Sequence, residues 1–191
     1  MQIALSWDLF VLVFFVVIVA YSFIIGRDNT LKVILGTYVA ALAADASGSL
    51  FAQYFGGSAL FKEILDLMQL GNETQVAVFI KVLVFVILVI LFAVRGAFSV
   101  NTSDDSSAVV RLGVCIIYAV LSAGLIVSII LVFVSGVTFI GGGNPETTTT
   151  ALSVITNQSP LIRMMLTNAY VWFALPAIAF LIDSLTTKSQ E

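Results

Sequence analysis

The sequence predicts an all-α fold: a polytopic membrane helix bundle of about five transmembrane helices plus one short amphipathic helix. Of its 191 residues, 60% are hydrophobic and only 10% are charged, whereas soluble domains carry about 25% charged residues. The mean hydropathy is +1.13. A chain this apolar cannot cover itself with polar surface, so the bilayer is its expected solvent. Since each span takes roughly 20 apolar residues, we expect one integral membrane domain over residues 1–191.

Five apolar stretches are long enough to serve as spans. They cover residues 5–25, 31–54, 76–94, 112–134 and 166–185. The residues that open the first stretch include an acid and no Lys or Arg, which is the reverse of a signal peptide, so we expect a retained helix. A short hydrophilic turn is predicted after it, and Asn29 or Thr30 is expected to cap the second helix.

Two segments between the spans are expected to differ from plain helices that cross the membrane. Residues 58–70 place apolar side chains at helical spacing with charged ones elsewhere, which predicts an amphipathic helix that is too short to span. Residues 135–165 are expected to form a loop. Pro160 interrupts the part of this loop before the fifth span, which we interpret as a re-entrant or interfacial piece.

A ladder of small residues runs along the second span. It consists of Gly36, Ala40, Ala44, Gly48, Ala52 and Gly56, one at every fourth position. Membrane helices associate through close packing, which small residues permit. The ladder therefore predicts a helix-packing interface. One reading is an oligomer interface or a moving helix; the other is ordinary packing within one bundle.

Asp45, beside the ladder, and Lys81, in the third span, are intramembrane charges. A charge at the centre of a spanning helix costs roughly 2.5 to 3.5 kcal/mol, so such residues face a partner or a cavity. Asp45 lies about 21 Å along the second span and Lys81 roughly 8 Å inside the outer end of the third. We therefore expect an ion pair or a shared polar pocket. In one alternative Asp45 lines an ion or proton path. In the other it is protonated or bonded to a nearby polar side chain while Lys81 extends outward.

The composition excludes several classes of chemistry. The chain has no His and one Cys, which excludes Ser-His and Cys-His catalysis and Cys/His zinc sites. Asp45 and Asp183 are expected at different depths and lack a GxGD context, which disfavours an aspartyl protease. No basic cluster suggests nucleic acid. We therefore expect no enzyme, no catalytic residues, no cofactor and no metal.

The distribution of Lys and Arg predicts orientation, because cytoplasmic loops carry an excess of these residues. With the N-terminus outside and the C-terminus cytoplasmic, five basic residues lie inside against two outside. The inner residues are Arg27, Lys32, Arg95, Arg111 and Lys188, and the outer ones are Lys62 and Arg163.

Residues 1 to about 135 carry short motifs typical of one bacterial family. Trp7-Asp8-Leu9-Phe10 opens the first span, Gly26-Arg27 follows it, and Leu31 to Gly36 leads into the small-residue span. The third span ends at Arg95, and Arg111-Leu112-Gly113 opens the fourth. On these motifs the chain resembles the colicin V production protein (CvpA-like) family of bacterial inner-membrane proteins. Asp28-Asn29-Thr30 replaces the second glycine and basic residues of that family's first turn, and the fifth span has no counterpart there.

The resemblance implies an architecture and a bacterial inner-membrane location, but no site residues. The function it implies is a multi-pass membrane scaffold or accessory subunit in an envelope or export process. The alternative from the residues is a small oligomeric channel or transporter with Asp45 lining the path. The expected partners are the lipid bilayer and either further copies of the chain or other membrane proteins, with no nucleic acid.

Overall fold

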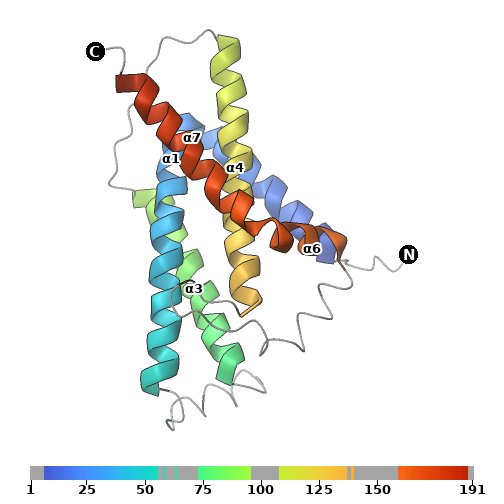
Figure 1. Cartoon of the computed structure of the whole chain (residues 1–191), viewed down its shortest axis with the longest axis vertical. Coiled ribbons are helices and arrows are strands. Elements are labelled where there is room, and N and C mark those ends of the chain that lie inside the picture. The colour runs from blue at the N-terminus through green and yellow to red at the C-terminus, as the bar shows by residue number, and fades with distance from the viewer. Residues whose placement is uncertain are drawn as a thin grey trace.

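The computed structural model describes residues 7–55, 58, 63, 73–95, 108–136, 139 and 159–188. All regular structure in these ranges is helical (Figure 1). The helices are α1 (Trp7–Phe55), α3 (Glu73–Arg95), α4 (Ala108–Val134), α6 (Pro160–Thr167) and α7 (Ala169–Lys188). The predicted amphipathic helix over residues 58–70 lies outside the described part of the chain except for Ser58 and Glu63.

Helix α1 is broken at Gly26, the one residue within it whose backbone is not helical (φ 79°, ψ 175°). Its 49 residues would measure about 73 Å as a straight rod, more than twice the hydrocarbon core of a bilayer. Figure 1 shows the first half rising to the break and the second half running back down. The break allows one continuous helical segment to supply two rods that run in opposing directions.

The predicted polar turn after the first span was wrong in length and in capping. The helix resumes directly after Gly26. Thr30 Oγ1 donates to the carbonyl oxygens of Gly26 at 2.8 Å and Ser22 at 3.1 Å, and Asn29 Nδ2 donates to Ile25 O at 2.9 Å. These side chains therefore donate hydrogen bonds to carbonyl oxygens at and before the break. They do not cap the second half of α1 by accepting hydrogen bonds from its backbone N–H groups.

Three described helices, α1, α3 and α4, are long and apolar enough to cross a membrane. The pair α6 and α7, bent by 57°, adds a fourth if it is taken as one broken span. Helix α4 is the central one, because 78% of its most apolar stretch is buried, against 17% for α3 and 11% for α1. The aromatic centre of the core joins α3 to α4, with the rings of Phe85 and Phe133 edge to face at 5.7 Å.

The structure corrects the predicted loop over residues 135–165, because α6 begins at Pro160. Ser159 caps this helix, and its hydroxyl accepts from the N–H of Ile162 at 3.2 Å. Proline suits the first helical position because its missing N–H would have no partner there. Two further bounds differ from the prediction: α4 starts at Ala108, before residue 112, and α7 starts at Ala169, after residue 166.

Candidate functional site

The centre of the candidate site is an ion pair between the second half of α1 and α3. Lys81 Nζ donates to Asp45 Oδ1 at 2.6 Å, and the side chains are 6% and 0% exposed. The sequence suggested this pairing from the depths of the two residues. A charge-assisted hydrogen bond of this length is a strong contact in a dry environment.

The second carboxylate oxygen of Asp45 also has a partner. Oδ2 accepts from the backbone N–H of Phe139 at 2.8 Å. The Phe139 ring packs against Phe133 at 5.6 Å and Phe173 at 5.2 Å, so this contact ties the segment after α4 to α1. Sequence reasoning missed it, because a backbone donor leaves no mark in the residue types.

The small-residue ladder faces α3 of the same chain along most of its length. Gly36, Ala40, Ala44 and Gly48 are buried, whereas Ala52 is exposed and Gly56 lies outside the described residues. A Cβ atom at Gly36 would stand 2.6 Å from Phe92 Cβ, and one at Gly48 would stand 2.8 Å from Lys81 Cε. The four buried members therefore pack within one bundle, and Gly48 makes room for the stem of Lys81.

A second ion pair joins the break in α1 to the far end of the chain. An Nη atom of Arg27 donates to Asp183 Oδ1 on α7, and the side chains are 15% and 16% exposed. The sequence placed Arg27 on the inner side, and Asp183 lies near the end of the fifth predicted span, residues 166–185, which the predicted topology puts on the same side. That shared depth was the available signal, but the packing of α7 against the break was not predicted.

Helix α7 is held to the bundle by side chains from two other helices. Tyr38 donates to Phe173 O, and Tyr118 donates to Ala179 O at 3.1 Å. Gly124 on α4 leaves room for the Trp172 indole, because an added Cβ would lie 2.8 Å from its Cδ2 atom. These contacts hold α7 against α1 and α4.

At the start of α1, the carboxylate of Asp8 contacts the residue that caps α6. Ser159 Oγ donates to Asp8 Oδ1, which also accepts from the N–H of Leu161 at 3.3 Å. A carboxylate at this position interacts favourably with the start of a helix. Asp8 thus links the first helix to α6, a role that the sequence did not reveal.

The polar contacts of the site are ion pairs and hydrogen bonds that join one helix to another. Among the described residues, no three His, Cys, Asp or Glu side chains cluster as metal ligands. Comparisons of the chain with protein-family models, with curated proteins and with solved structures each returned no match.

Proposed function

We propose that the chain is a five-span scaffold or accessory subunit of a bacterial inner membrane, acting through helix contacts in an envelope or export process. The resemblance of its first 135 residues to CvpA-like proteins supports this class and location. Five spans follow if the two halves of α1 are counted separately and the bent pair α6 and α7 is counted as one.

The proposed orientation has the N-terminus outside and the C-terminus cytoplasmic. The break in α1, the end of α3, the start of α4 and the end of α7 all lie in the upper half of Figure 1. Arg27, Lys32, Arg95 and Arg111 belong to these ends. Because basic residues favour the cytoplasmic side, this end is proposed to face the cytoplasm.

The observation that carries the proposal is the engagement of Asp45. Both of its carboxylate oxygens have partners, Lys81 Nζ and the Phe139 N–H, and the residue is fully buried. A carboxylate that binds a transported ion must exchange its partners with that ion or with water. In one copy of the chain Asp45 instead stabilises the bundle from within, which favours a scaffold over a channel or transporter.

Complementation in the host bacterium tests the proposal. Deletion of the gene is expected to weaken the envelope, measured as sensitivity to detergent. The double variant Asp45→Asn/Lys81→Met removes both charges together, and it is expected to restore resistance as the wild-type chain does. Restoration by the wild type alone, at equal membrane levels of both proteins, would instead support a role for the charges in transport.

A further inference from the structure

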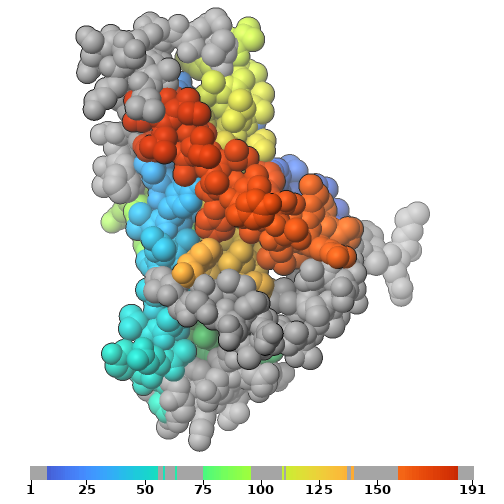
Figure 2. Space-filling view, viewed as in Figure 1, coloured from blue at the N-terminus to red at the C-terminus, as the bar shows by residue number. Residues whose placement is uncertain are grey.

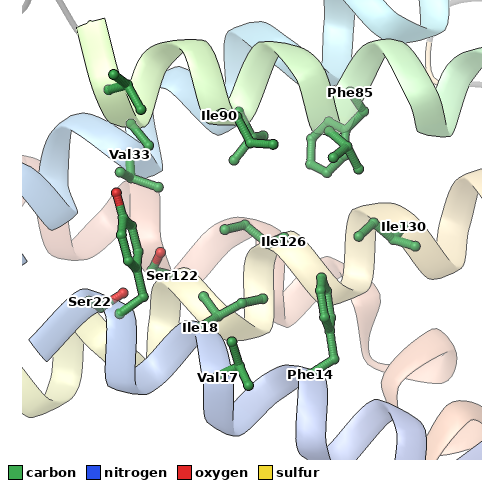
Figure 3. A pocket seen from close by; sticks show the side chains of 15 residues that line it. Phe14, Val17, Ile18, Ser22, Val33, Phe85, Ile90, Ser122, Ile126 and Ile130 are labelled. Atoms are coloured by element: carbon green, nitrogen blue, oxygen red, sulfur yellow. The ribbon is translucent and has the colours of Figure 1, made fainter. Parts of the chain in front are cut away.

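An apolar groove lies between α1, α3 and α4, lined on α1 mostly by its first half; we call it the α1–α3–α4 groove. Its volume is about 440 Å³. Figure 3 shows side chains from all three helices pointing into it, with Ile126 and Ile130 of α4 forming the floor. The space-filling view in Figure 2 shows α7 and the second half of α1 on the near face. Exposed apolar side chains such as Val17 and Ile90 border the groove, so it opens toward lipid.

The size of the groove suits a thin hydrocarbon chain. It is about three times the roughly 150 Å³ apolar cavity that binds one benzene ring. It therefore fits a chain on the order of sixteen to eighteen carbons, the length of a common acyl chain.

The two ends of the groove differ in polarity. Figure 3 shows Ser22 and Ser122 together at one end and Phe14 and Phe85 at the other. The Ser122 hydroxyl is fully buried and has no hydrogen-bond partner within the described structure. A buried donor left unpaired costs free energy, so an oxygen atom of a ligand in the groove is its natural acceptor.

The polar end is also the basic end of the bundle. Ser22 lies four residues before the break at Gly26, and its carbonyl accepts from Thr30 just after the break. Lys32 directly precedes the lining residue Val33, and Arg95 directly follows the lining residue Val94. Cations near a membrane surface attract anionic head groups. The polarity and the charge thus match a lipid whose head lies at this end.

We propose that the α1–α3–α4 groove binds one anionic phospholipid of the leaflet that contacts the break in α1. Its acyl chain fills the groove, an ester carbonyl accepts from Ser122 Oγ, and its phosphate lies near Lys32 and Arg95. The proposal rests on the membrane location and not on the scaffold role. Because it is tested on the purified chain, its failure is distinct from a failure of the proposed function.

Native mass spectrometry of the chain in mild detergent, titrated with palmitoyl-oleoyl phosphatidylglycerol, tests this proposal. Ala93 lines the groove, so Ala93→Phe fills it and is expected to weaken retention of one lipid by at least tenfold. Ala174→Phe places the same ring on an exposed site of α7 and is expected to leave retention unchanged. If Ala93→Phe does not fold, Ile90→Trp at the mouth replaces it.

A matched pair of serine variants tests the polar contact. Ser122 and Ser128 are both buried on α4 and have no hydrogen-bond partner among the described residues, but of the two only Ser122 lines the groove. Ser122→Val is expected to weaken retention about fivefold, the effect of one net hydrogen bond, and Ser128→Val is expected to have no effect. Equal effects of the two serine variants would overturn the contact with Ser122.

The remaining outcomes are also decisive. Retention of phosphatidylglycerol well above phosphatidylcholine is expected from the basic end, and equal retention would overturn the anionic head group. Three results would overturn the site itself: a wild-type chain that retains no lipid, an Ala93→Phe variant that retains it as the wild type does, or a dimer mass in place of the lipid adduct.

Discussion

Replacing Lys81 with methionine should destabilise the bundle more than any other single change at the ion pair. Methionine keeps a long stem beside Gly48 but removes the cation from Asp45 Oδ1, which is 2.6 Å from Nζ. Asp45 is fully buried and its side chain is short, so its carboxylate cannot reach water. Breaking a buried pair by removing one partner costs about 3 to 5 kcal/mol, and we expect Lys81→Met to fall in this range.

The reverse single variant, Asp45→Asn, should cost less, about 1 to 3 kcal/mol. Its amide still faces the N–H of Phe139, and the long Lys81 side chain can extend toward the head groups at the Glu73 end of α3. The double variant leaves no unpaired charge, and we expect it to be more stable than Lys81→Met. A double-mutant cycle built from the wild type, the two single variants and the double variant should therefore show a coupling free energy of up to about 3 kcal/mol between Asp45 and Lys81.

Equilibrium unfolding in mixed detergent–SDS micelles measures these free energies. Lys32→Met serves as the control, because Lys32 is partly exposed and its Nζ atom donates to Asn29 Oδ1 at 3.2 Å. Exposed contacts of this kind contribute at most about 1 kcal/mol. Additive single variants, with coupling below about 0.5 kcal/mol, would refute the view that the pair stabilises the bundle as a unit.

Three further substitutions test other contacts. Gly48→Ala should cost about 1 to 3 kcal/mol by crowding Lys81, whereas Gly113→Ala, with nothing within 4 Å of the added Cβ, should be neutral or stabilising; unfolding of the two variants compares them, and equal effects would contradict the close approach. Gly26→Ala should cost about 1 to 3 kcal/mol because φ 79° and ψ 175° suit glycine alone; the same assay, showing no loss, would argue against the sharp break. Ser159→Ala should cost about 0.5 to 2 kcal/mol and speed amide hydrogen exchange at Ile162, whose N–H bonds to the Ser159 hydroxyl; unchanged exchange would contradict the cap.

The sequence was sufficient to predict an all-helical chain with membrane-length apolar helices, because hydropathy and length decide that directly. It also predicted that Asp45 and Lys81 lie close together, because the depth of each residue follows from its position in its span at a rise of 1.5 Å per residue. The number of spans stays a prediction, because the structure counts three helices of spanning length, or four with the bent pair.

The remaining features depend on backbone conformation and on which helices become neighbours. Gly26 is followed by polar residues that resemble a loop, yet Asn29 and Thr30 bond back to the preceding carbonyls and keep the chain helical. Pro160 looked like an interruption, although proline is equally suited to start a helix. The pairing of Arg27 with Asp183 requires α7 to lie beside the break, and no local pattern specifies that placement.

Ion flux through proteoliposomes tests whether the Asp45–Lys81 pair is structural and the chain acts by contact. The wild-type chain and the Asp45→Asn/Lys81→Met variant are reconstituted in separate vesicles, and release of K⁺, Na⁺ and H⁺ is followed with ion-sensitive dyes. If the pair is structural, both proteins leave flux at the level of empty vesicles. Flux through the wild type that the double variant abolishes would contradict a structural role and make Asp45 part of a conducting path.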